Sequence, residues 1–103
     1  MARAAETASE LLKSLGNPTR LLILCRLTEA ECSVGDLVAF LGIRDSTVSQ
    51  HLALLRKDGL VQTRREGQTI WYAIASEPAR RVLETLFAIY CCPGQRLSPP
   101  EPH

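Results

Sequence analysis

Apolar residues recur every three or four positions over much of the chain, which is the spacing of one face of an α-helix. The first such stretch covers residues 4–15 and is stopped by Gly16 and Asn17. The second covers residues 20–30, with Asn17 as an N-cap and Pro18 in the first turn. The pattern therefore begins with two helices, and the leucine-rich second one is apolar enough to be central.

Two more helices are predicted on either side of a short turn at residues 42–44. Ser33, followed three residues later by Asp36, has the form of a capping box and begins a helix that lasts to residue 41. After the turn, Asp45 or Ser46 can cap the next helix, which lasts to about residue 58. Two helices joined in this way form a helix-turn-helix.

Beyond Gly59 the apolar period changes from about 3.6 to two, which indicates β-strands. Residues 60–65 alternate, Glu66 and Gly67 offer a tight turn, and residues 69–74 are rich in β-formers. A hairpin directly after a helix-turn-helix is a wing. The predicted fold is therefore mainly α with a β-hairpin wing, a winged helix-turn-helix.

A last helix follows the hairpin, with Ser76 as its cap and Pro78 in its first turn. Its apolar stripe continues to Cys92, and three prolines then mark residues 93–103 as a disordered tail. Residues 1–92 are predicted to form one domain, because 103 residues are too few for two independent cores. A helical domain of this size often completes its burial with a partner chain, so a homodimer is expected.

The total charge of the chain does not indicate nucleic-acid binding, because the formal net charge is only +1. No apolar run approaches the roughly 18 residues that cross a membrane, and the start of the chain has no signal-peptide core, so a soluble cytoplasmic protein without membrane contact is expected. Residues 44–66 carry a mild local excess, five basic against three acidic side chains: Arg44, Arg56, Lys57, Arg64 and Arg65 against Asp45, Asp58 and Glu66.

The helix at residues 45–58 has the composition of a recognition helix. Val48, Leu52 and Leu55 share one face and are predicted to enter the core. The other side chains are then available to DNA, although such a polar face is also typical of an ordinary solvated helix. The predicted contacts are Thr47, Gln50 and His51 to bases, Ser46 and Ser49 to phosphates, Arg56 and Lys57 to phosphates, and Arg64, Arg65 and Gln68 from the wing.

Several motifs in order are similar to the ArsR/SmtB family of winged-helix repressors: LGNPTR at 15–20, STVSQHL at 46–52, LR at 55–56, GLV at 59–61, REG at 65–67 and WY at 71–72. The resemblance covers residues 5–92. It implies a homodimer, built from the first and last helices, that binds a palindromic operator in double-stranded DNA. It also implies that an inducer releases the repressor from the operator.

The cysteines depart from the metal-sensing patterns of that family, which use a Cys-x-Cys pair at the third helix or Asp, His and Glu on the last helix. Ser33 and Gly35 stand where the pair would fall, Cys32 is displaced by one residue, and the last helix has no histidine. No cofactor and no zinc or cobalt site are therefore expected. No motif of the family identifies Cys32 as a sensor.

The segments LCRL at 24–27 and IYC at 89–91 are similar to the persulfide-sensing branch of the family, the BigR and SqrR type. The resemblance implies that Cys25 and Cys91 react with persulfide or polysulfide and thereby weaken operator binding. Two alternatives stay open. Cys25, Cys91 and Cys92 together can bind arsenite or another soft metal ion, or Cys25 is simply a small buried apolar residue.

An enzyme is not expected, because no nucleophile with a nearby base and no phosphate-binding glycine loop is visible. The remaining rival from another class is a winged helix that binds proteins and has no DNA contacts. Binding to promoter DNA that depends on sequence and salt separates the two, since phosphate contacts release counterions.

Overall fold

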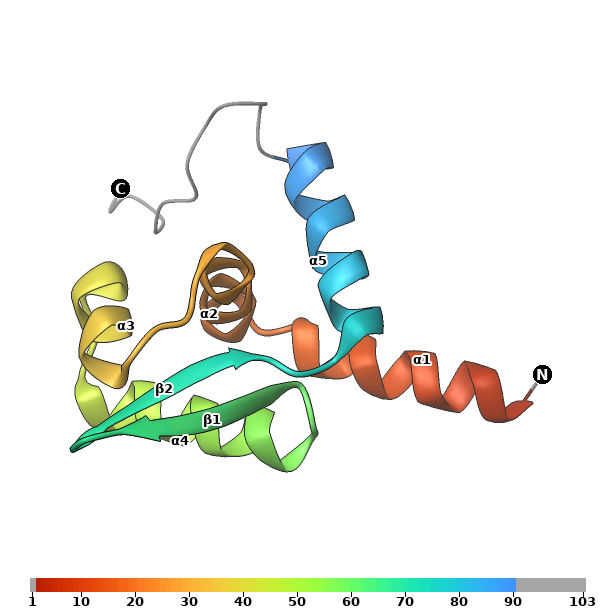
Figure 1. The fold of residues 1–103 in the computed structure, drawn as a ribbon. Helices are drawn as coiled ribbons and strands as arrows, with labels where there is room; N and C mark the ends of the chain where they lie inside the picture. Colours follow the sequence, from red (N-terminus) through yellow and green to blue (C-terminus); the bar gives the residue numbers. More distant parts are fainter. Residues whose placement is uncertain (1, 91–103) are drawn as a thin grey trace.

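The helices and the hairpin follow the predicted order along the chain. The computed structural model describes residues 2–90. In chain order its elements are α1 (Ala2–Leu15), α2 (Pro18–Glu29), α3 (Val34–Leu41), α4 (Asp45–Lys57), β1 (Val61–Glu66), β2 (Thr69–Ile74) and α5 (Glu77–Tyr90). Figure 1 shows α2 in the middle of the molecule, with α3, α4 and the hairpin on one side and α1 and α5 reaching outward on the other. The predicted winged helix-turn-helix is confirmed.

Local capping explains where two of the helices begin. The Asn17 side chain accepts a hydrogen bond from the Arg20 amide at 3.1 Å and caps α2. Ser33 and Asp36 form both bonds of the predicted capping box at the start of α3. Gly42 closes α3 in the left-handed conformation, with φ 70°, which suits a residue without a Cβ.

The cap of α4 was predicted one residue too late. Neither Asp45 nor Ser46 occupies the N-cap position, because the Arg44 carbonyl already accepts hydrogen bonds from the amides of Thr47 and Val48, both at 3.1 Å. Arg44 makes no side-chain capping bond, and Asp45 instead places its carboxylate in the first turn. A negative charge there interacts favourably with the helix dipole.

The hairpin has a two-residue turn, one position later than the predicted Glu66 and Gly67. Glu66 pairs with Thr69 in the antiparallel register, so Gly67 and Gln68 make the turn. Gly67 has a φ of 63°, which a glycine adopts without strain. This register places alternate residues of each strand on opposite faces of the wing.

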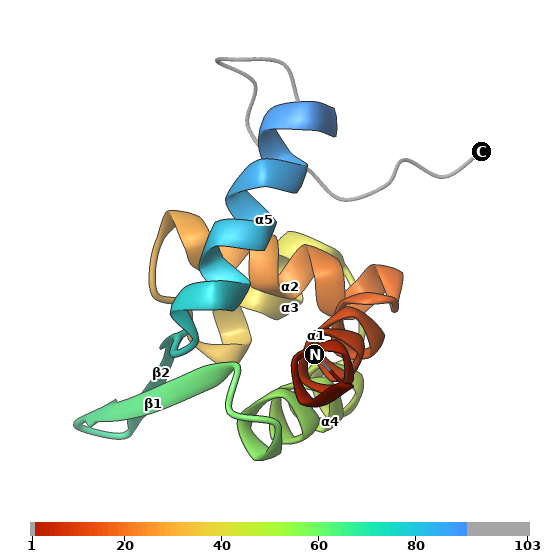
Figure 2. The ribbon, with the colours of Figure 1, turned by 90° about the vertical axis from the view of Figure 1, so that its right-hand side faces the viewer.

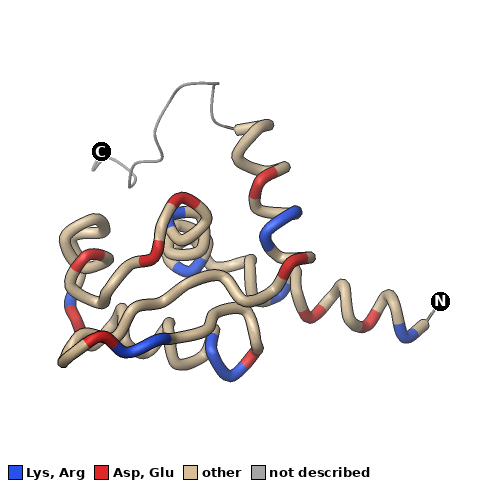
Figure 3. The backbone as a smooth tube through the Cα atoms, viewed as in Figure 1, with Lys and Arg blue, Asp and Glu red and all other residues tan. Residues whose placement is uncertain are grey.

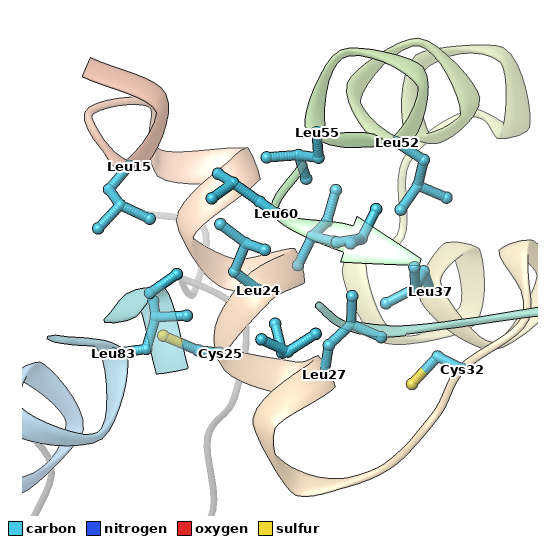
Figure 4. Close-up of a cluster of buried hydrophobic side chains, with 14 of the residues drawn as sticks. Leu15, Leu24, Cys25, Leu27, Cys32, Leu37, Leu52, Leu55, Leu60 and Leu83 are labelled. Carbon is cyan, nitrogen blue, oxygen red and sulfur yellow. The ribbon is translucent and has the colours of Figure 1, made fainter. Parts of the chain in front are cut away.

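The core lies around α2 and contains apolar side chains from every helix and from both strands (Figure 4). α2 contributes four buried residues: Ile23, Leu24, Cys25 and Leu27. The predicted stripe on α5 is only partly covered, since Leu83 is buried while Tyr90 is 80% exposed, and the neighbouring Ile89 is 65% exposed. Figure 2 shows why, since α5 extends away from the hairpin and beyond the other helices.

None of the helices between residues 2 and 90 combines the length and the apolar character needed to cross a membrane.

Candidate nucleic-acid interface and thiol site

The recognition helix is held by three side chains on one face. Val48, Leu52 and Leu55 are each 0% exposed, as their spacing predicted. Figure 4 shows Leu52 and Leu55 entering the core from α4. Because these three residues fix the rotation of the helix about its axis, the opposite face is turned to solvent. It carries Ser46 and Gln50 exposed and Thr47 and Ser49 half-buried.

His51 is less available than its neighbours. The residue is half-buried, and its Nδ1 is buried with no hydrogen-bond partner among the described residues. Burial, and to a lesser extent the positive charge of Arg20, lowers the pKa of His51. The imidazole is therefore neutral near pH 7, and only Nε2 remains for a contact with a base.

The two arginines of the wing lie on opposite faces of the hairpin. Arg65 pairs with Ile70 and shares a face with Val61 and Ile74, which are 3% and 6% exposed. That face is the one turned toward the core and α4. Arg64 pairs with Trp71 and points to the other face.

Arg64 is held by two carboxylates. Its Nε donates to both carboxylate oxygens of Glu31, at 2.8 and 3.1 Å, and its Nη2 donates to Glu31 Oε1 at 2.9 Å. Its Nη1 donates to Glu66 at 2.7 Å, and its guanidinium lies 5.7 Å from the centre of the Trp71 ring. These bonds raise the pKa of Arg64 and lower the pKa of Glu31. A contact of Arg64 with DNA stays a prediction, and it would require the release of both carboxylates.

A hollow of about 470 Å³ lies between the C-terminal half of α4 and Tyr72 of the wing. Leu52 and Ala53 form its apolar part, and its polar lining is Ser49, Arg56, Lys57 and Tyr72. Arg56 and Lys57 form no salt bridge within residues 2–90, and Figure 3 shows basic positions both at the end of α4 and on the hairpin. The structure thus brings three predicted phosphate contacts together around a concave surface that carries no carboxylate.

Tyr72 is the residue of this hollow that the sequence reasoning missed. A usable signal was present, because Tyr72 lies two residues before the buried Ile74 and therefore shares its face of the strand.

Arg65 and Gln68 lie exposed at the tip of the wing, where Arg65 Nε donates to the Gly67 carbonyl at 3.0 Å.

The predicted sensor thiols are only partly within the described chain. Cys25 lies on α2, is 8% exposed and points toward Leu83 of α5 (Figure 4). Cys91 and Cys92 lie outside the described residues, as does the predicted tail 93–103. In the described part of the chain, no three His, Cys, Asp or Glu side chains cluster in a way that could hold a metal ion.

Cys32 has a structural role that its sequence did not reveal. It is 4% exposed, and its backbone exchanges two hydrogen bonds with Tyr72 of β2, at 3.1 and 2.8 Å. Its thiol donates to the Ala30 carbonyl at 3.5 Å. Burial raises the pKa of this thiol, so that it stays protonated and unreactive at neutral pH.

A short turn between α3 and α4, a recognition helix with a solvent-facing polar side, and an adjoining hairpin define a winged helix-turn-helix of the DNA-binding class. Residues 17–63 match the family model described as "Bacterial regulatory protein, arsR family". The chain is also 48% identical over 95 residues to the biofilm growth-associated repressor of Agrobacterium fabrum, covering 92% of this chain and 80% of the relative. The chain belongs to the ArsR family.

Solved structures agree with this assignment. Reduced HlyU from Vibrio cholerae has a TM-score of 0.86 and 45% identity, covering 88% of this chain and 96% of that chain. The transcriptional repressor BigR from Xylella fastidiosa has a TM-score of 0.82 and 40% identity, covering 88% and 93%. HlyU is named a transcriptional activator. These relatives are regulators of transcription and not enzymes, and the same holds for this chain.

Proposed function

We propose that this chain is a homodimeric repressor that binds a palindromic operator and leaves it when Cys25 and Cys91 react with a persulfide or polysulfide. The observation that carries the DNA-binding part is the fixed rotation of α4. Three fully buried residues hold one face in the core, and short polar side chains occupy the other. Such a helix fits the major groove, where Gln50 can pair with adenine and Thr47 can contact a base or a phosphate.

The hollow beside α4 supports the same docking. A helix in the major groove and a hairpin at the neighbouring minor groove stand on the two sides of one phosphate backbone. That backbone must then pass through the space between them. Here the space is lined by Arg56 and Lys57 together with the hydroxyls of Ser49 and Tyr72. These side chains are suited to a phosphate, because they offer two positive charges and two hydrogen-bond donors.

Exposed apolar side chains on α1 and α5 support the homodimer. Leu12 on α1 is 60% exposed, and Ile89 and Tyr90 at the end of α5 are 65% and 80% exposed. A second copy that covers these helices would remove the exposed surface from water. It would also place two copies of α4 at a fixed spacing, which a palindromic operator requires.

Fluorescence anisotropy with DNA from upstream of the chain's own gene tests the DNA-binding part. Wild-type protein should bind this DNA more tightly than a scrambled duplex of the same length. The logarithm of the affinity should fall linearly with the logarithm of the salt concentration. Binding that is independent of both sequence and salt would exclude the repressor and favour a winged helix that binds proteins.

The proposed sensing reaction is a two-step thiol exchange. One cysteine thiolate attacks the outer sulfur of a persulfide R–S–SH, so that the S–S bond breaks, R–SH leaves and a protein persulfide forms. The second thiolate attacks the protein-bound sulfur, and H₂S leaves as the Cys25–Cys91 disulfide forms. Two thiols are oxidised, and the outer sulfur of the persulfide is reduced to sulfide. The likeness to BigR and the existence of a reduced form of HlyU support this assignment.

Cys25→Ser and Cys91→Ser, with Cys32→Ser as the matched control, test the sensor. An organic persulfide should weaken DNA binding by wild type and by Cys32→Ser but not by the first two variants. Intact-mass spectrometry of the treated wild type should show the loss of two hydrogens that a disulfide produces. Binding of arsenite would instead add the mass of arsenic, and an unchanged response in both sensor variants would contradict the dithiol mechanism.

A further inference from the structure

The wing is attached to the segment between α2 and α3 at two points. The first is the pair of backbone hydrogen bonds between Cys32 and Tyr72. The second is the set of three hydrogen bonds from Arg64 to Glu31. The two attachments start from adjacent residues of the segment and end on different strands of the hairpin, so together they restrict the tilt of the hairpin.

The Arg64 attachment lies on the side of the wing that does not face α4. Arg64 covers Trp71 on that face, while Arg65 and Tyr72 occupy the face toward α4 and the hollow. Glu66 binds the same guanidinium from within β1. Arg64 therefore has three partners on the outer face.

We propose that Glu31 and Arg64 are positioning residues, which hold the wing at the angle where Arg65 and Gln68 reach DNA beside α4. The proposal rests on the proposed DNA-binding function and replaces the direct DNA contact predicted for Arg64. Glu31 lies two residues beyond the end of α2, so the ion pair joins the wing to the segment that follows this helix.

Glu31→Ala removes the carboxylate that joins Arg64 to the segment between α2 and α3, and Glu29→Ala is the matched control. Glu29 is the last residue of α2, carries the same charge and, within residues 2–90, forms an ion pair only with Arg26 of its own helix. Operator affinity should fall about fivefold in Glu31→Ala, the upper range for an exposed ion-pair network, and stay near wild type in Glu29→Ala. Because only contacts of the wing are lost, the salt slope of Glu31→Ala should fall by no more than that of Arg65→Gln.

Two combinations separate positioning from a general loss of stability. In a background with both Arg65→Gln and Gln68→Ala, whose wing contacts are already removed, Glu31→Ala should have no further effect. The charge exchange Glu31→Arg with Arg64→Glu, made together with Glu66→Gln so that the exchanged carboxylate meets no like charge, should recover most of the affinity. A further reduction of the salt slope by about one when Arg64→Gln is added to the Arg65→Gln background would overturn the proposal, since Arg64 would then itself neutralise a phosphate. Tighter binding by Glu31→Ala would also overturn it.

Hydrogen exchange without DNA keeps the test independent of the proposed function. Amides of the wing, residues 62–73, should exchange faster in Glu31→Ala than in Glu29→Ala, because the hairpin has lost one of its two attachments. Equal exchange in the two variants would refute the positioning role even if operator binding were confirmed. Faster exchange together with wild-type protein that does not bind the promoter would leave the attachment valid and refute only the DNA-binding function.

Discussion

Replacement of Leu52 by alanine tests whether burial of one face holds the recognition helix. Leu52 is 0% exposed in α4, whereas Leu54, two residues further along the same helix, is 48% exposed. Full burial of a leucine side chain contributes about 1.5–3 kcal/mol. The cavity left by truncation raises the cost of Leu→Ala to about 2.7–5 kcal/mol. A domain of this length has a total stability of about 5–15 kcal/mol, so Leu52→Ala removes a large part of it.

Urea unfolding followed by circular dichroism measures this difference. At a slope of about 1–3 kcal/mol per molar urea, the midpoint of Leu52→Ala should fall by about 1 M or more. Leu54→Ala, the control, should cost about 1 kcal/mol at most, because half of its surface is already in water. Protein concentration must be the same in all samples, since association stabilises a dimer. Equal losses in the two variants would refute the assigned rotation of α4.

Three other predictions concern single side chains. Gln50→Ala should abolish the preference for one base pair of the operator, a loss of about 1–3 kcal/mol there. Arg56→Gln should instead weaken binding to all sequences alike and reduce the salt slope by about one. Binding to a set of single-base operator variants measures both effects, and a uniform loss of affinity in Gln50→Ala would contradict base reading by this residue. Ser33→Ala should lower the free energy of unfolding by about 0.5–2 kcal/mol through loss of the capping box, and an unchanged urea midpoint would exclude that contribution. Because burial lowers the pKa of His51 in the folded protein, the unfolded chain takes up the proton more readily. The contribution of His51 to the free energy of unfolding should therefore be fully present above about pH 6.5 and be lost as the pH falls below that value. The thermal midpoints at about pH 7.5 and 5.5 should differ less in His51→Gln than in wild type, and an equal difference would argue against this origin.

The elements themselves follow from local patterns. Ser33 and Asp36, three residues apart, determine the start of α3 through hydrogen bonds that need no other part of the chain. The spacing of Val48, Leu52 and Leu55 identifies the buried face of α4, and thereby the polar face that is offered to DNA. These features can be read from sequence because helices and tight turns are formed by residues at most a few positions apart.

Contacts between distant segments required the tertiary structure. Arg64 looked like a free basic residue of the wing, but its carboxylate partner Glu31 lies 33 residues earlier in the chain. Tyr72 joins Arg56 and Lys57 only because the hairpin folds back beside α4. Such pairs depend on how whole elements pack, and no local period records that.

The sequence alone determined the recognition helix and its polar residues, since one helical period sorts buried from exposed positions. The tertiary structure decided which of these residues remain available. It buries Nδ1 of His51, holds Arg64 on the outer face of the wing and leaves Ile89 and Tyr90 uncovered at the end of α5. The physical reason is that periodicity defines the faces of a single element, whereas availability to a partner depends on which neighbouring element covers each face.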